Sequence, residues 1–346
     1  MTAGAAPAAG AAAGRRPPRG TPLWLLVLSG ILVALAATSV TVGSRDVEWA
    51  DVLAALSGSV DGFDQAAVAK RIPRTLLAAA AGAALGVAGA VMQGVTRNPL
   101  ADPGILGVNM GASLAVASGI GYFGLTSATA YTWVAIAGAG ATAVFVYAVG
   151  SMGRGGATPL KLALAGAATS AALASSISAV VLPRGDIADS VRSWQIGGVG
   201  GGTFDSIGRV LPFLAVGFLV CLLSARRLNL LALGDDVAAG LGARVAVART
   251  TSAFGAVVLC GATTAVTGPI GFVGLVVPHV CRLLVGVDHR WLLPFSAVGG
   301  AVLLTAADVV GRIAARPGEV DVGIVTALVG GPFFIYIVRR QKVRDL

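Results

Sequence analysis

Charged side chains are scarce in this sequence. Asp, Glu, Lys and Arg together make up 12% of the 346 residues, whereas soluble domains carry roughly a quarter. So few charges cannot cover the surface of a soluble protein of this size, which excludes a soluble globular domain and indicates that lipid is the solvent. Glycine is abundant by contrast, with 49 positions, which is typical of helices that approach one another closely in a bilayer.

Other absences exclude several functions. No Gly-x-x-x-x-Gly-Lys-Ser/Thr motif occurs, so the chain cannot bind ATP through a P-loop. No Cys/His cluster has the spacing of a catalytic metal site, and we interpret Cys221, Cys260 and Cys281 as packing residues. We find no chain of carboxylates across the apolar segments, which an ion-coupled pump usually needs. We therefore expect no enzyme activity, no bound metal or cofactor, and a driving force supplied by another protein.

Long apolar stretches dominate the chain. A helix that crosses the hydrocarbon core needs about 20 apolar residues. The stretches that contain no charged residue are 20–44, 75–96, 103–153, 162–183, 210–225, 250–281, 291–307 and 322–338. The third is too long for one span and should break near Gly124–Ser127. The sixth would be roughly 48 Å long as a single helix, so we expect a break at Gly268-Pro269. The sequence thus predicts an all-α membrane protein with ten transmembrane helices.

The pattern also predicts the domain organisation. A disordered tail is expected at 1–20, a transmembrane domain at 21–340 and a second tail at 341–346. Ten is even, so both termini share a side, and the distribution of Lys and Arg favours placing both in the cytosol.

Two connections are expected to be structured. The outer segment Val47–Leu56 should form a short amphipathic surface helix. The inner connection 226–249 should form two short helices with a break near Gly234, and it is the obvious contact surface for an energy-supplying partner.

Some residues invite specific interpretations from their position alone. Gly82, Gly86, Ala90 and Gly94 recur every four residues, which predicts a flat helix face for close packing. Asp308 and Arg312 are spaced for an i,i+4 ion pair, although Arg312 could instead face a partner.

Two further polar positions are less determined. Arg71 and Arg74 precede the second span and are equally consistent with interface anchors and with a docking site for an acidic partner. His289, in the inner loop, is expected to be solvated.

Several segments together carry a family resemblance. They read RIPRTL (71–76), GAVMQ (89–93), NPLADPGILG (98–107), GPIGFVGLVVPH (268–279) and DHR (288–290). In this order they resemble the FecCD-type permeases, the subunits of ABC importers for iron–siderophore complexes, haem and cobalamin. The resemblance covers roughly residues 22–340.

The resemblance implies a fold and a set of partners. It implies a ten-helix, type II ABC importer permease-like bundle in the bacterial cytoplasmic membrane. The permease works as a pair with a second copy or a paralogue, on two cytosolic ATPase subunits that carry ATP and Mg. An outer substrate-binding protein, expected to be a lipoprotein, delivers the cargo. No nucleic acid is involved.

The resemblance also assigns roles to residues. Docking of the binding protein falls on Arg71, Arg74 and Arg312. The contact with the ATPase falls on Leu233, Gly234, Asp235, Asp236, Ala238, Ala239, Gly240, Leu241 and Gly242. The gate and pathway fall on Thr158, Pro159, Leu160, Ser170, Ser175, Ser176 and Ser178, because the fifth and tenth helices, about 160–182 and 322–339, line the pathway in this family.

The expected function is ATP-driven import of an iron–siderophore complex by alternating access. Haem and cobalamin stay open as cargo, and so does the choice between a homodimer and a heterodimer. The alternative is a secondary transporter driven by an ion gradient. A membrane enzyme would need a polar catalytic cluster that the sequence does not offer, and a channel would not need the long inner loop.

Overall fold

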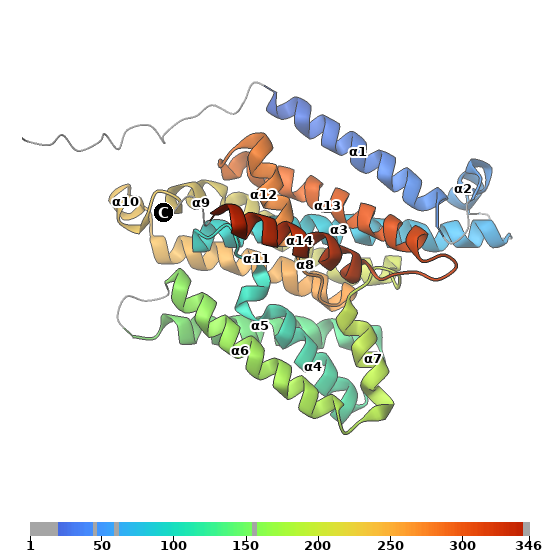
Figure 1. The fold of residues 1–346 in the computed structure, drawn as a ribbon, viewed down its shortest axis with the longest axis horizontal. Helices are drawn as coiled ribbons and strands as arrows, with labels where there is room; N and C mark the ends of the chain where they lie inside the picture. The colour runs from blue at the N-terminus through green and yellow to red at the C-terminus, as the bar shows by residue number, and fades with distance from the viewer. Residues whose placement is uncertain (1–19, 44–46, 59–61, 154–157, 342–346) are drawn as a thin grey trace, which may run out of the picture.

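The computed structural model describes residues 20–43, 47–58, 62–153 and 158–341. All regular structure within these ranges is helical, as predicted, and no strand occurs in them. Most of the long helices run along the long axis of the molecule (Figure 1). The predicted tails, 1–20 and 341–346, lie almost wholly outside the described residues.

Across the described residues, seven helices have the length and apolarity of a membrane span. They are α1 (Thr21–Thr41), α3 (Phe63–Thr96), α5 (Ala128–Ser151), α6 (Pro159–Val181), α8 (Phe204–Leu223), α11 (Val245–Thr267) and α13 (His289–Ala314). Three further apolar helices are α4 (Val108–Phe123), α12 (Val273–Val285) and α14 (Val322–Gln341). Together they follow the order of the ten expected segments, although the apolar parts of these three are shorter than the others.

The two predicted breaks are present. The chain leaves α4 at Gly124 and re-enters a helix after Ser127, whose side chain accepts a hydrogen bond from the Ala130 amide. Between α11 and α12, Gly268 has φ +70°, a conformation that residues with a side chain rarely adopt. It also lies against the Trp194 carbonyl, with which a side chain would collide.

The central element is α3. It begins at Phe63, before the first apolar residue expected of its span, and continues through Pro73. Most of its apolar window, 78%, is buried inside the protein. Gly82 and Gly86 lie directly against the backbone of α13, and Ala90 is fully buried. The helix face predicted for close packing thus lies against α13.

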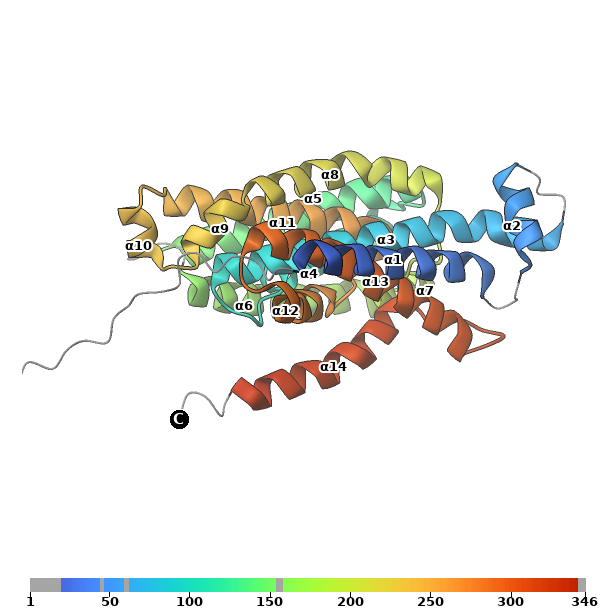
Figure 2. The ribbon, with the colours of Figure 1, turned by 90° about the horizontal axis from the view of Figure 1, so that it is seen from above.

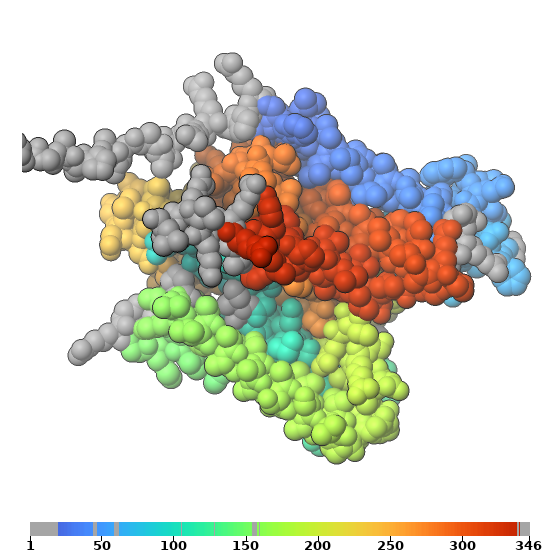
Figure 3. Space-filling view, in the orientation of Figure 1, coloured from blue at the N-terminus to red at the C-terminus, as the bar shows by residue number. Residues whose placement is uncertain are grey.

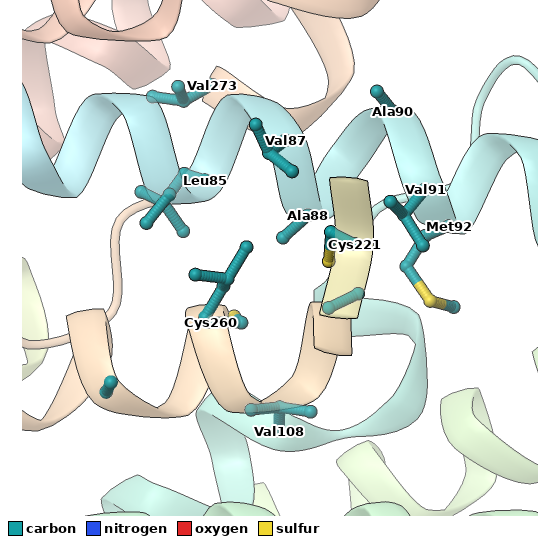
Figure 4. Close-up of a cluster of buried hydrophobic side chains, with 14 of the residues drawn as sticks. Leu85, Val87, Ala88, Ala90, Val91, Met92, Val108, Cys221, Cys260 and Val273 are labelled. Carbon is teal, nitrogen blue, oxygen red and sulfur yellow. The ribbon is translucent and has the colours of Figure 1, made fainter. Parts of the chain in front are cut away.

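The core surrounds the middle of α3. Figure 4 shows side chains from different helices meeting there, among them Val87 and Met92 of α3, Cys221 of α8 and Cys260 of α11. Cys221, Cys260 and Cys281 are all free and buried, which confirms their interpretation as packing residues. Alanine is the most frequent residue among the described core side chains, which lets the helices approach one another at close range.

The connections hold short helices. They are α2 (Trp49–Leu56), the 3-10 helix η1 (Pro103–Leu106), α7 (Gly185–Ile196), α9 (Ala225–Leu231) and α10 (Asp235–Gly240). The predicted surface helix is α2, and the predicted pair with a break at Gly234, where φ is +104°, is α9 and α10. The sequence did not predict α7, because its charged residues obscure the apolar positions that pack it.

The molecule has two different ends and two different faces. The end that carries α2 lies opposite the end that carries α10 (Figure 2). On one face, α14 diverges from the bundle, while α5 and α8 lie on the opposite face. Figure 3 shows the first face: α14 and α6 both reach the surface, and teal residues of the α3–α4 region are visible between them.

Candidate functional site: the two ends of helix α3

Arg74 organises the α2 end of the molecule. Its Nη2 lies 2.8 Å from Asp308 Oδ1 in α13, and its Nη1 lies 2.6 Å from Glu319 Oε2. Its side chain keeps 14% exposure, and the carboxylate of Glu319 is 40% exposed. This arginine therefore ties α3 to α13 and still reaches the surface, where a partner could contact the Arg74–Glu319 pair.

Arg312 is buried in the same cluster. Its Nη2 lies 3.0 Å from Asp308 Oδ2, which confirms the predicted i,i+4 ion pair. Its Nη1 donates to the Ser39 and Val42 carbonyls at 2.8 and 3.2 Å. Only 1% of Arg312 is exposed, so the guanidinium is occupied by α13 and by the end of α1.

Arg71 makes a similar contact from α3. Its Nη1 donates to the Val40 and Thr41 carbonyls at 3.1 and 3.0 Å, and the residue is 8% exposed. The last carbonyls of a helix have no partner within it, and α1 has no basic residue in its own last turn. Two arginines from elsewhere in the chain therefore cap α1, a structural role that the sequence analysis missed.

The docking role of these three arginines stays a prediction. Arg74 is the member whose side chain reaches the surface, whereas Arg71 and Arg312 hold α1 in place. The signal that could have revealed the capping role is the last turn of α1, which contains no basic residue.

At the opposite end, α10 presents an apolar edge outward. Leu233, Val237 and Leu241 are spaced by four and are 42%, 53% and 61% exposed. Asp236, Ala239, Gly240 and Gly242 are exposed as well, whereas Ala238 is buried and packs the helix down. Val237 lies in α10, and Leu233 and Leu241 lie just before and after it. Exposed apolar side chains beside charged residues are typical of a surface that a partner covers.

Asp235 fixes α10 to the bundle. Its Oδ1 lies 3.2 Å from Arg97 Nη2 and 3.1 Å from Arg249 Nη2. Arg97 ends α3 in the left-handed conformation with φ +51°, and Arg249 lies in α11. The first residue of α10 therefore bridges the ends of two spanning helices, so it faces inward while Asp236 faces outward.

The predicted solvation of His289 is wrong. The residue is 5% exposed, and its ring lies where a side chain on Gly94 would project. Its Nδ1 hydrogen-bonds Asn229 Oδ1 at 2.8 Å, and Asn229 Nδ2 donates to Asp288 Oδ1 at 2.6 Å. The last glycine of the α3 face makes room for this ring, which is why a histidine next to charged residues is buried.

The Asp288 carboxyl belongs to the same junction. Partial burial by itself would raise its pKa, but hydrogen bonds from Arg290 and Asn229 together hold the pKa below its ordinary value. Asp288 thus stays charged and caps α13 by accepting from the Arg290 amide.

The predicted gate and pathway residues lie on α6. The Thr158 side chain caps this helix by accepting from the Lys161 amide, Pro159 begins it, and Leu160 is exposed. Ser170 is half-buried, whereas Ser175, Ser176 and Ser178 are exposed and donate to carbonyls of their own helix. This wall is weakly polar, because its hydroxyls are already bonded. Its gate and pathway roles stay predictions.

Among the described residues, no three His, Cys, Asp or Glu side chains are placed to hold a metal ion.

Known proteins are similar to this chain in sequence and in fold. Residues 31–340 match the FecCD transport family. The chain belongs to this family. The ferric enterobactin permease FepD of Escherichia coli is 44% identical over 313 residues, which are 90% of this chain and 93% of FepD. The Fe(3+)-citrate import permease YfmD of Bacillus subtilis is 41% identical, over 88% of this chain and 90% of YfmD.

Two further similarities extend the comparison. The hemin transport permease HmuU of Yersinia pestis is 40% identical, over 79% of this chain and 82% of HmuU. The solved structure of an inward-facing metal-chelate type ABC transporter has a TM-score of 0.81 at 28% identity, over 92% of this chain and 99% of that one. This FecCD protein is therefore a multi-pass membrane transport permease, as its resemblance to the family implied.

Proposed function

We propose that this chain is the permease of an ATP-driven importer for an iron–siderophore complex or a related haem or cobalamin chelate. It crosses the membrane ten times, with α4, α12 and α14 as the three shorter crossings and both termini in the cytosol. It binds no cofactor itself, since ATP and Mg belong to the partner ATPase.

The observation that carries this proposal is the geometry of α10. The chain has no nucleotide-binding motif of its own, so its energy must enter through a contact. The exposed stripe of Leu233, Val237 and Leu241 offers an apolar surface to a cytosolic partner. Asp235 joins the same helix to α3 and α11, so a force on α10 reaches the bundle.

The partners follow from the two ends. Two ATPase subunits would bind α10, within the inner connection 226–249, one on each permease copy. A substrate-binding protein would dock at the opposite end, where Arg74 is the accessible member of the arginine set. A second copy or a paralogue would face α6 and α14, which lie on the same side of the bundle (Figure 3).

The mechanism we favour is alternating access. Closure of the ATPases moves α10, and α3 with α13 follows as one body, because their backbones touch along the glycine face. The serine-bearing wall of α6 would then open to one side of the membrane at a time. The wall carries no strong ligand in its described part, which lets a bulky chelate pass without being trapped.

The cargo class rests on the relatives. FepD, YfmD and HmuU carry names that specify ferric enterobactin, ferric citrate and hemin. A deletion strain of the host organism should lose growth under iron starvation on one ferric chelate of a panel, and plasmid-borne wild-type chain should restore it. Unchanged growth on every ferric siderophore, haem and cobalamin source would refute this cargo class.

The energy source is tested separately. Uptake of the identified chelate into vesicles should require internal ATP and the co-reconstituted ATPase, and it should persist after ion gradients are collapsed. Uptake that follows a proton or sodium gradient without nucleotide would favour the rival reading, a secondary transporter.

A further inference from the structure

A deep apolar groove lies on the face opposite α14. It has a volume of about 710 Å³ and is lined by α5, α8 and α11. Among its described lining residues, the only polar side chains are Tyr147 and Thr250. Since α5 and α8 lie away from the α6–α14 face (Figure 2), the groove belongs neither to the proposed pathway nor to the face proposed for a second permease copy.

The groove has the length of one lipid leaflet. Its lining on α5 runs from Ile136 to Ala148, about 18 Å of helix at 1.5 Å per residue. One leaflet of the hydrocarbon core is about 15 Å deep. At the outer limit, the rings of Trp133 and Phe213 meet edge to face with centroids 5.4 Å apart, one turn before Ile136. The groove therefore ends near mid-membrane and opens toward the α10 end.

Toward its open end, the groove meets polar groups in the same order as a phospholipid has them: first hydroxyls near the ester linkages, then basic side chains near the phosphate. Tyr147 and Thr250 join their hydroxyls at 2.9 Å across α5 and α11, at the depth where acyl esters begin. Exposed arginines lie beyond them: Arg244 at the start of α11, and Arg226 and Arg227 in α9, which follows α8. Arg249, by contrast, is buried and bound to Asp235. Basic side chains at this position attract the phosphate of an anionic lipid.

We propose that this groove is a binding site for one anionic phospholipid of the cytosolic leaflet. Its acyl chain lies along α5 and α11, and its phosphate lies among Arg226, Arg227 and Arg244. The leaflet assignment rests on the orientation given under the proposed function, while the site itself does not depend on transport.

The test uses two matched glycines. A side chain at Gly140, inside the groove, would meet nothing within 4 Å, and the same holds at Gly30 on the exposed side of α1. Gly140→Phe should therefore fill the groove without a clash, and Gly30→Phe is its control on another lipid-facing surface. The purified transporter is stripped of lipid and titrated with phosphatidylglycerol or phosphatidylcholine of identical chains. Native mass spectrometry counts the lipids bound to each permease chain.

The wild type should bind one phosphatidylglycerol per chain about tenfold more tightly than phosphatidylcholine, as expected from several arginines near one phosphate. Gly140→Phe should weaken this binding about tenfold or more, and Gly30→Phe should not. The combined change Arg226→Gln, Arg227→Gln and Arg244→Gln should remove the preference between the two headgroups.

Equal lipid binding by the two phenylalanine variants would overturn the proposal, and so would equal affinity of the wild type for the two headgroups. If Gly140→Phe does not fold, a six-carbon phosphatidylglycerol decides instead. It should bind the wild type at least about tenfold more weakly than the long-chain lipid, because most of the acyl contact is missing. A wild-type transporter that takes up an iron chelate but binds no phosphatidylglycerol selectively would refute this site alone. Selective phosphatidylglycerol binding by a transporter that takes up no iron, haem or cobalamin chelate would refute the proposed cargo alone.

Discussion

The buried arginines at the α2 end mainly stabilise the structure, because they bind a carboxylate and the last carbonyls of α1. A charged group at membrane depth is costly unless it is paired, and Arg312 satisfies this by binding Asp308 and two carbonyls of α1. Arg71 adds two more bonds to the same helix end. The loosely packed α1, of which only 6% of the apolar window is buried, is therefore fastened at its end by buried guanidinium groups.

Arg312→Met should destabilise the protein by about 1–3 kcal/mol, because the α1 carbonyls lose a buried donor while Asp308 keeps its pair with Arg74. Thermal unfolding in detergent measures the effect. Lys70→Met removes an exposed charge from the same end and should change stability by about 0.5 kcal/mol or less. Equal melting temperatures for the two variants would contradict the capping role.

Asp235 and Asp236 are neighbours with different environments. Asp235→Asn loses its bridge to Arg97 and Arg249 but should cost only about 1 kcal/mol or less, because the carboxylate is 40% exposed and solvent screens it. It should reduce uptake while the ATPase still co-purifies, since the outward stripe is intact. Uptake is measured together with ATP hydrolysis by the purified complex, and uptake equal to that of the wild type would argue against force transmission through Asp235.

At the scale of elements, α3 connects the two ends of the molecule. Its start carries Arg71 and Arg74, and it ends at Arg97, the partner of Asp235. Between these points its glycine face lies against α13 with no side chain between the backbones. Such a contact transmits displacement rigidly, because close-packed interiors do not deform continuously.

Gly82→Val should separate α3 from α13, since the added side chain would collide with the Gly300 carbonyl. We expect a loss of about 1–3 kcal/mol or more from overpacking, together with loss of uptake. Gly30→Val, on a helix with open space at that position, controls for the substitution itself. A melting temperature equal to that of the control would show that the helices do not touch here.

The proposed contact between α10 and the ATPase belongs to the scale of elements as well. Replacing Val237 and Leu241 together by Ser should abolish co-purification of the ATPase, because both side chains are more than half exposed and point away from the bundle. The fold should survive, since neither side chain is buried. Undiminished co-purification would place the ATPase contact elsewhere.

At the scale of the whole molecule, the exposed faces differ in chemistry. The free side of α1 carries large side chains such as Leu26 and Val33, whereas the free side of α6 carries Ser175, Ser176 and Ser178. Large apolar groups suit contact with acyl chains. A small, weakly polar wall suits a water-filled passage between two copies.

Cysteine placed at Ser176 should therefore react with a membrane-impermeant maleimide in the assembled transporter, and cysteine placed at Leu219 should not. Leu219 is also exposed in the single chain but lies on α8, on the face away from α14. The three native cysteines are buried, which keeps the background low. Labelling at Leu219 but not at Ser176 would show that the α8 face lines the water-filled passage and that the α6 face contacts lipid.

Much of the fold was predictable because lipid leaves a helix few alternatives. Apolar length determined the order of the spanning helices, glycine and proline determined the breaks at Gly124 and Gly268, and regular spacing of small residues identified the contact face of α3. The motifs identified the family, which the match over residues 31–340 confirms. The helix α7 and the early start of α3 were missed, because charged and proline residues there resemble a loop locally.

The sequence by itself determined the solvent, the helices and the family, since these follow from hydrophobic length and from local spacing. Only the tertiary structure decided which partners the polar side chains have. Arg71 and Arg312 bind the end of α1, Asp235 bridges two helices, and His289 packs against Gly94. Each of these partnerships joins residues that are distant along the chain or depends on how two helices meet. A local pattern carries no information about such a meeting, because its energy exists only once the helices are packed.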